Sequence, residues 1–239
     1  MDAGQEAQPE ELGTPEDDLR SLEEDLRSGK TENVSADLGL PGAHQGKRRI
    51  LMASGRVCIA KPASGIQDWP FAAQSEAAAW TVARRLGLRE LVPVTVVREI
   101  ELPEGRTELA ALQLWVDDYD ADRMDEFPEE DLDWAGVFDH LIQQTDRDGH
   151  NWLVWRDEHG RPRLKLTDNG YAFGAPNRTF SSQFSRDRSG RPLNDKMLAA
   201  LRRLKEPEFA EELKELLHHD QVEALLGRVD ILLDRQQLP

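Results

Sequence analysis

A short polar block near position 150 constrains this 239-residue chain more than any other feature. Asp146 and Asn151 stand five residues apart, and Asp168 follows seventeen residues after Asn151. Residues 152–155 and 163–166 are short runs containing Trp, Leu and Val around a polar turn, which predicts two antiparallel strands. Such a hairpin brings Asn151 and Asp168 to the same end of neighbouring strands. One divalent metal could then bridge them.

The segment T-D-R-D-G-H-N-W at residues 145–152, followed by D-N-G at residues 168–170, resembles blocks of the atypical kinases. The similar families are the phosphatidylinositol 3/4-kinase-like proteins, the HipA-like kinases and the FAM20-type kinases of the secretory pathway. The resemblance implies that Asp146 receives the proton of an attacking hydroxyl. It also implies that Asn151 and Asp168 hold Mg²⁺ or Mn²⁺ against the phosphates of ATP.

Two positions depart from the pattern of those families. Asp148 and Gly149 stand where lipid kinases usually carry His-x or His-Gly. Asn169 replaces the phenylalanine of the D-F-G motif. The in-and-out switch of a typical protein kinase is therefore not expected here.

Composition indicates a soluble domain of enzyme size. Hydrophobic residues make up 38% of the chain, and the mean hydropathy is −0.64. No run approaches the ~18 apolar residues of a membrane helix, and the N-terminus lacks the pattern of a signal peptide. The single cysteine, Cys58, excludes an internal disulfide, suits a reducing compartment and lies in an apolar run that favours burial. We therefore expect a cytoplasmic protein without stable membrane association.

Negative charge is concentrated at the start of the chain. The net charge is −16, and residues 1–37 carry twelve acidic residues against three basic ones, a net −9. Few large apolar residues occur there, which predicts a mostly disordered acidic tail. Leu19, Leu22 and Leu26 are spaced for one short amphipathic helix, which leaves a docking segment and a solvating tail as alternatives. Nonspecific nucleic-acid binding is not expected, because it needs clustered Lys and Arg.

The ordered part is expected to begin at residue 38 with a small β-rich lobe. Residues 48–53 and 56–61 are β-rich runs around Ser54-Gly55, which predicts a hairpin. Gly39, Gly42 and Gly46 precede it. These glycines either let the backbone approach a triphosphate or are ordinary loop residues, since their spacing matches no nucleotide-binding motif.

Lys61 ends the apolar run at 57–60, as in the V-A-I-K pattern of kinases, where the lysine meets the α- and β-phosphates. Residues 71–86 have apolar residues at helical spacing, and Gly87 follows as a probable helix end. Glu76 is a lone charge among small apolar neighbours in that helix. In the kinases that the chain resembles, a glutamate from this helix forms an ion pair with the lysine. The resemblance therefore implies that Glu76 is the partner of Lys61.

The boundary between the lobes is predicted just after the strand candidates at 92–98 and 107–116. Kinases of the similar families bind the adenine edge through backbone groups at this point, and an apolar side chain packs on the adenine face. The corresponding residues here are Gln113, Leu114, Trp115 and Val116. A helix starting near Pro128 should then support the catalytic loop.

The segment after Gly170 is polar and turn-rich, and it resembles an activation or substrate loop. Its charge is inverted relative to the rest of the chain, because four arginines face a single acidic residue. These arginines either receive an anionic substrate group or are solvated: Arg178, Arg186, Arg188 and Arg191. Helices are predicted after Asn194, at 207–217 and at 220–233.

Three other interpretations of the central block are disfavoured. An EF-hand loop needs glycine at its sixth position and glutamate at its twelfth, but these positions hold Asn151 and Asp157. A zinc site from His140, His150 and His159 lacks ligand spacing on any one element. An HNH-type nuclease could use His150 and Asn151, but this chain lacks the second metal-binding histidine and the basic surface that such a nuclease needs.

The sequence therefore predicts an α+β, two-lobed, protein-kinase-like fold. Residues 1–37 form the tail, 38–116 the nucleotide lobe and 117–239 a reduced helical lobe. The predicted function is Mg-ATP-dependent transfer of the γ-phosphoryl group to a hydroxyl of a soluble protein or small molecule. The alternatives are AMP transfer, a phosphoinositide kinase and a pseudokinase. The intact set of kinase residues opposes a pseudokinase, and the acidic surface opposes a lipid kinase.

Overall fold

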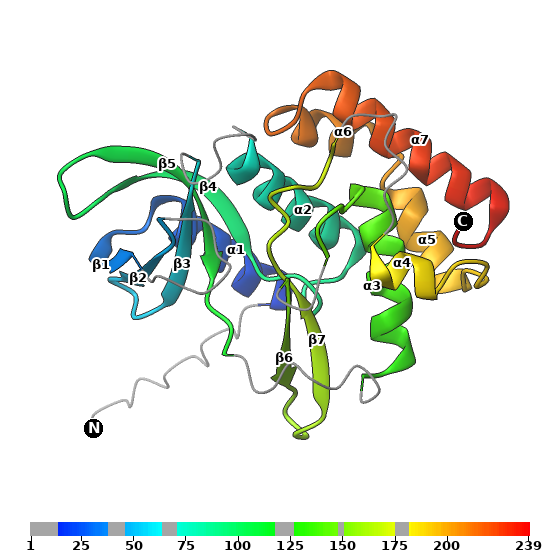
Figure 1. Ribbon diagram of the computed structural model, residues 1–239, viewed down its shortest axis with the longest axis horizontal. Coiled ribbons are helices and arrows are strands. Elements are labelled where there is room, and N and C mark those ends of the chain that lie inside the picture. The colour runs from blue at the N-terminus through cyan, green and yellow to red at the C-terminus, as the bar shows by residue number, and fades with distance from the viewer. Residues whose placement is uncertain (1–13, 38–45, 64–70, 118–126, 148–150, 175–181) are drawn as a thin grey trace, which may run out of the picture.

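The computed structural model describes residues 14–37, 46–63, 71–117, 127–147, 151–174 and 182–239. An antiparallel sheet and the C-terminal helices lie at opposite ends of the molecule (Figure 1). Helices α2 (Ala72–Leu86) and α3 (Glu129–Ile142) lie between them, as does the hairpin of β6 (Trp152–Arg156) and β7 (Pro162–Leu166). This mixture of helices and strands agrees with the predicted α+β class.

The larger sheet has five strands in the order β1-β2-β3-β5-β4, with antiparallel neighbours. Its strands are β1 (Thr31–Asp37), β2 (Arg48–Met52), β3 (Val57–Pro62), β4 (Thr95–Glu101) and β5 (Thr107–Leu114). Side chains alternate along β3, so Cys58 and Ala60 are buried while Ile59 and Lys61 are partly exposed on the other face. The predicted hairpin around Ser54-Gly55 is confirmed as β2 and β3.

Helix α2 packs on β4 and β5 and confirms the helix predicted at residues 71–86. Ala78, Ala79 and Ala83 have no exposed surface, because small side chains let the helix approach its neighbours closely. Gly87 ends the helix in the left-handed region at φ 82°, where a side chain would be strained. The same helix also contacts α3, α5 (Asp195–Arg203) and α6 (Pro207–Lys214).

Ionic contacts attach the C-terminal end of α2 to the helices that follow. Arg84 pairs with Glu212 of α6, and Arg85 pairs with Glu206 just before it. Arg203 of α5 donates to the backbone carbonyl of Arg85 at 3.2 Å. Helix α2 is therefore bound to both halves of the molecule.

The remaining helices form the reduced helical lobe, and the first and the last of them pack on α3. They are α4 (Gln183–Asp187), α5, α6 and α7 (His219–Arg235). The Asn194 side chain accepts from the Met197 N–H at 2.9 Å and caps α5, as its position in the sequence predicts. Within the part of the chain that the structure describes, no helix is long and apolar enough to cross a membrane.

The expectation of a disordered leading segment is wrong for residues 14–37, and the ordered lobe does not start at residue 38. Thr14 and Asp17 form a capping box that begins α1 (Pro15–Ser28), and β1 pairs with β2. Leu26 is fully buried, and Leu19 and Leu22 pack against the same core. The predicted short amphipathic helix is therefore present, packed on its own chain. Residues 1–13 and the glycines at 39 and 42 lie outside the described residues.

The acidic composition of α1 misled the prediction because its partners are far away in the sequence. Glu23 accepts from the Trp80 indole at 2.8 Å and pairs with Arg84 at 3.0 Å. Asp25 pairs with Arg56 at 2.8 Å beside the β2–β3 turn. These carboxylates attach the helix to the fold, whereas a composition-based prediction assigns them to solvent.

We predict that Leu26→Ala lowers the free energy of unfolding by about 2–5 kcal/mol, because it leaves a cavity where α1 meets the core. The measurement is urea unfolding followed by circular dichroism. Arg27→Ala is the matched control, since Arg27 is the exposed neighbour on the same helix and its loss should change stability by less than about 0.5 kcal/mol. Equal stability of the two variants would show that α1 is not part of the folding unit.

Candidate functional site

A cavity of about 500 Å³ lies between the five-stranded sheet and the β6–β7 hairpin, a size typical of small-molecule sites. Six of the residues that the sequence singled out line it: Lys61, Gln113, Leu114, Trp115, Val116 and Asp168. The lining also contains Lys47, Ile59, Asp117, Leu153 and Thr167. The structure therefore brings the predicted lysine, the predicted hinge and the second carboxylate around one space.

The end of β5 forms one wall of this cavity. The Leu114 N–H donates to Val94 at 2.9 Å and the Trp115 N–H donates to Val57 at 3.0 Å, so both are used by neighbouring backbone. The Trp115 ring lies 5.6 Å from the Arg49 guanidinium, within cation–π range. The side chain of Gln113 is buried and donates to the Thr95 hydroxyl at 3.1 Å. Gln113 thus contributes to the rigidity of the wall.

Lys61, on the neighbouring strand β3, meets Glu76 of α2 at the cavity wall. The distance from Lys61 Nζ to Glu76 Oε1 is 2.5 Å, and Glu76 is only 2% exposed. Lys61 Nζ also lies 3.7 Å from Asp168 Oδ1. The other oxygen of Asp168 contacts Lys47 Nζ at 2.8 Å. A carboxylate from the helix and one from the turn after β7 therefore surround the strand lysine.

These contacts determine the charges of the groups. Burial would lower the pKa of Lys61, but Glu76 and Asp168 outweigh it and raise that pKa above its ordinary value. Burial would raise the pKa of Asp168, but Lys61 and Lys47 hold it well below its ordinary value. Burial raises the pKa of Glu76, and Lys61 opposes that rise. At neutral pH Lys61 is therefore a cation and Asp168 an anion, as phosphate and metal binding require.

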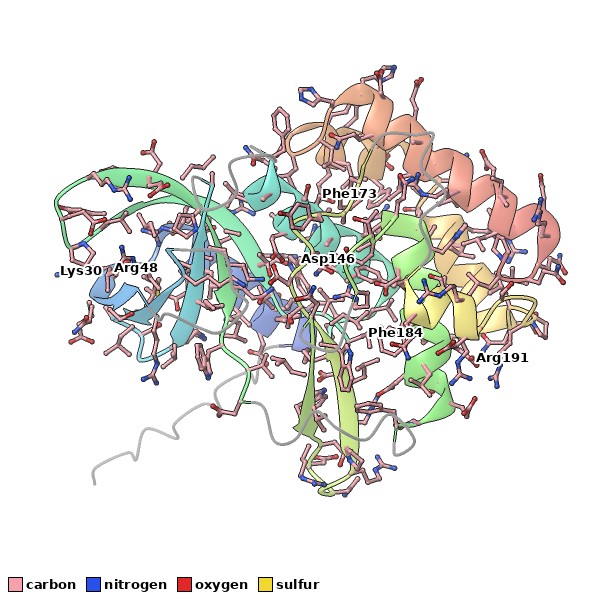
Figure 2. The ribbon with its side chains drawn as sticks, viewed as in Figure 1. Lys30, Arg48, Asp146, Phe173, Phe184 and Arg191 are labelled. Atoms are coloured by element: carbon pink, nitrogen blue, oxygen red, sulfur yellow. The ribbon has the colours of Figure 1, made fainter. Side chains whose placement is uncertain are left out.

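Asp146 lies near the middle of the molecule, where the sheet, the hairpin and the helices meet (Figure 2). It is exposed, and Asn151 Nδ2 donates to its backbone carbonyl and lies 3.3 Å from its Oδ2. Its own N–H donates to Gln144 Oε1 at 3.0 Å. The structure therefore brings Asp146 and Asn151 together, as their spacing implies. Asp148, Gly149 and His150 lie outside the described residues.

Arg147 organises this loop, and sequence reasoning gave it no role. Its side chain and that of Asp139 on α3 are both fully buried and pair at 2.8 Å. Its guanidinium also donates to the carbonyl of Asn151 at 2.6 Å, to the carbonyl of Thr167, and to Asn169 Oδ1 at 2.7 Å. All five N–H groups of the arginine are thereby used. The sequence signal that could have indicated this role is Asp139, an acidic residue in the apolar helix that precedes Asp146 and Arg147.

The contact with Arg147 also accounts for the asparagine in the D-N-G motif. Asn169 is fully buried, and its side-chain oxygen accepts from Arg147, which a phenylalanine could not do. The preceding residue, Asp168, adopts φ 55°, a left-handed conformation that aspartate tolerates better than most residues. Gln144 supports this turn by donating to the Asp168 carbonyl at 3.2 Å.

The structure pairs two of the four predicted arginines with α3, and neither lines the cavity. Arg188 and Arg191 both pair with Glu129 and Asp133 in the first turns of α3. Arg191 lies far from Asp146 in Figure 2. Arg186 is on the short helix α4, and Arg178 lies outside the described residues. The sequence-based prediction missed these contacts because the acidic partners precede the arginines by more than fifty positions.

The donor atoms near Asp168 fit Mg²⁺ or Mn²⁺. Within the described ranges, no group of three or more His, Cys, Asp or Glu side chains could hold a metal ion. Mg²⁺ in nucleotide sites is usually held by one or two protein oxygens together with phosphate oxygens. Asp168 offers a carboxylate, and Asn151 offers its amide oxygen because its nitrogen is bound to Asp146.

No protein-family model matches the chain, and no curated protein matches its sequence. Similarity is found in solved structures. The crystal structure of the Golgi casein kinase with Mn/ADP bound gives a TM-score of 0.63 at 14% identity, over 92% of this chain and 76% of that chain. A second crystal structure of the Golgi casein kinase gives a TM-score of 0.62 at the same identity and coverage.

The chain therefore has the two-lobed kinase fold, which confirms the predicted fold class. It is also similar to the Helicobacter pylori proinflammatory kinase CtkA, with a TM-score of 0.51 at 12% identity over 86% of this chain and 93% of that chain. These likenesses support the atypical-kinase resemblance at the level of fold. The resemblance to lipid kinases and to HipA-like kinases stays a prediction.

We predict that Arg147→Met lowers the free energy of unfolding by about 3–5 kcal/mol, because Asp139 would be left buried and unpaired. The double variant Arg147→Met/Asp139→Leu should recover much of that stability, since it removes both charges. It should not recover any phosphoryl transfer, because the Asn151 carbonyl and the Asn169 side-chain oxygen would still lack the hydrogen bonds from Arg147 that position the loop. Urea unfolding and a transfer assay measure the two effects. Full activity in the double variant would show that Arg147 does not position the loop.

The lowered pKa of Asp168 predicts a pH dependence of stability. Its ion pairs contribute fully above its ordinary pKa of 3.8 and are lost as pH falls through the lowered value. The free energy of unfolding of the wild type should therefore fall more steeply than that of Asp168→Asn between about pH 5 and pH 2. Urea unfolding at a series of pH values tests this. Parallel curves for the two proteins would contradict it.

Proposed function

We propose that the protein is an Mg-ATP-dependent phosphotransferase that moves the γ-phosphoryl group to a hydroxyl. The observation that carries this proposal is the meeting of Lys61, Glu76 and Asp168 at one wall of a nucleotide-sized cavity. Asp146 is hydrogen-bonded to Asn151, whose carbonyl accepts from the N–H of Thr167 in the cavity lining. A charged lysine held between two carboxylates is suited to bind phosphate. At such low sequence identity, the structural similarity to the solved kinases supports the fold alone. The proposed activity therefore rests on these residues.

The cavity would hold the nucleotide with its base near Trp115 and its phosphates near Lys61. Leu114 and Trp115 line the wall beside the base, and their N–H groups are used by the sheet. The contact to the adenine edge therefore falls to Val116 and to backbone carbonyls. Lys61 would bind the α- and β-phosphates, and Glu76 would keep its ammonium group in place.

Transfer would proceed by in-line displacement at the γ-phosphorus. The hydroxyl oxygen forms a bond to the γ-phosphorus. At the same time the bond between the γ-phosphorus and the β–γ bridging oxygen breaks, which releases ADP. Asp146 accepts the hydroxyl proton, and Asn151 keeps its carboxylate in place. When bound, Mg²⁺ or Mn²⁺ would neutralise phosphate charge, and Asp168 and Asn151 are the residues that would hold it. One solved structure similar in fold contains Mn and ADP, which supports this assignment.

The acceptor that we favour is a soluble protein or a small hydroxyl compound. A phosphoinositide kinase gains from a basic surface near the membrane, and this chain carries a net charge of −16 without a polybasic run. Arg188 and Arg191 are neutralised by α3, so they do not supply such a surface. The cytoplasmic location stays a prediction.

The proposal can be tested with ATP labelled separately at the α- and γ-phosphorus. The purified protein is incubated with Mg²⁺ and with candidate protein and small-molecule acceptors. Recovery of γ label on an acceptor supports the kinase. Recovery of α label would instead show AMP transfer, and no transfer together with nucleotide binding would show a pseudokinase.

We predict that Lys61→Ala and Asp168→Ala both abolish the thermal stabilisation by Mg-ATP, because one loses a phosphate contact and the other a metal ligand. A ligand at 100 times its Kd contributes about 2.7 kcal/mol, so the loss is measurable as a melting-temperature shift. Asp146→Asn should keep the stabilisation and lose turnover. If Asp146→Asn loses ATP binding while Asp168→Ala keeps it, the roles of the two carboxylates are wrongly assigned.

A further inference from the structure

Lys47, which directly precedes β2, and Lys61 on β3 share one carboxylate at the wall of the cavity. Lys47 Nζ lies 2.8 Å from Asp168 Oδ2, and Lys61 Nζ lies 3.7 Å from Asp168 Oδ1. The β2–β3 register pairs Arg48 with Ala60, so one further step places Lys47 opposite Lys61. Like charges directly opposite each other on a sheet are destabilising. This arrangement therefore needs an anion between the two lysines.

In the free protein, Asp168 supplies that anion. With all four side chains ionised, Lys47, Lys61, Glu76 and Asp168 together carry no net charge, and the side chains of the two lysines are only 13% and 12% exposed. A divalent cation added to Asp168 would leave a net charge of +2 in this partly buried space. Repulsion between such charges is strong where solvent is limited. The phosphates of a nucleotide would remove the excess.

We infer that Lys47 is a second phosphate-binding lysine, which holds Asp168 in the free protein and releases it when a nucleotide binds. This inference rests on the proposed function and adds a sequence of events to nucleotide and metal binding. Lys47 exchanges one anionic oxygen for another, from the carboxylate of Asp168 to a phosphate. Asp168 Oδ2 then becomes available to a metal. Nucleotide and metal consequently bind with positive coupling, and each raises the affinity for the other by the same factor.

Lys47→Gln separates the two halves of this inference, because they change in opposite directions. The variant should bind ADP with Mn²⁺ about tenfold more weakly, the effect of losing one charge-assisted hydrogen bond. It should bind Mn²⁺ alone more tightly than the wild type, since Asp168 is no longer held. Titration calorimetry measures ADP binding, and the electron paramagnetic resonance of free Mn²⁺ measures metal binding.

Lys196→Gln is the matched control. Lys196 pairs with Glu130 at 2.5 Å on the surface, and its side chain is 72% exposed. That variant should bind ADP and Mn²⁺ as the wild type does. Lys47→Arg keeps the positive charge and should restore most of the ADP affinity while keeping Mn²⁺ binding weak.

Several outcomes would overturn the inference. Unchanged ADP affinity in Lys47→Gln would show that Lys47 does not bind phosphate. A parallel loss of ADP and Mn²⁺ binding would show that Lys47 only supports the fold. Failure of the wild type to bind ADP would instead contradict the proposed function, whereas the Mn²⁺ titration of Lys47→Gln would still decide whether Lys47 holds Asp168.

Discussion

The buried guanidinium of Arg147 is the contact on which the arrangement of the site depends. It connects α3 through Asp139, the start of β6 through Asn151, and the turn after β7 through Thr167 and Asn169. These segments are separate in the chain, and each contributes a residue to the proposed chemistry or stands next to one. Burying a charge is costly unless every donor finds an acceptor, so loop arrangements that leave the Arg147 donors unpaired are disfavoured.

A second constraint on the site comes from β3 and α2. The period of β3 directs Lys61 toward the cavity, and the small side chains of α2 let Glu76 approach it. The carboxylate of Asp168, fixed by the turn that Arg147 supports, completes the group. The sheet and the helical part thus meet through ion pairs of limited exposure. Such pairs are geometrically demanding, and their value here lies in defining positions more than in adding stability.

The sequence was sufficient for features set by local patterns. Period and turn residues predicted β2, β3, α2 and the β6–β7 hairpin, and the resemblance to kinase motifs singled out Lys61, Glu76 and Asp146. It was insufficient where a side chain depends on a partner far along the chain. The acidic residues of α1 were assigned to solvent, and the arginines near residue 190 to solvent or to an anionic substrate group. Both sets are instead paired with distant charges. Lys47 and Arg147 were missed for the same reason, since register and loop packing give them their roles.

Helix α2 belongs to the sheet by chain order, but its contacts do not follow that division. Arg84 and Arg85 attach it to α6, Arg203 attaches it to α5, and Ser75 reaches the Ala172 carbonyl beyond the D-N-G turn at 3.4 Å. The two lobes are therefore fused along this helix. Separating them would break the contacts on one of its sides. These contacts oppose a movement of the sheet relative to α5 and α6.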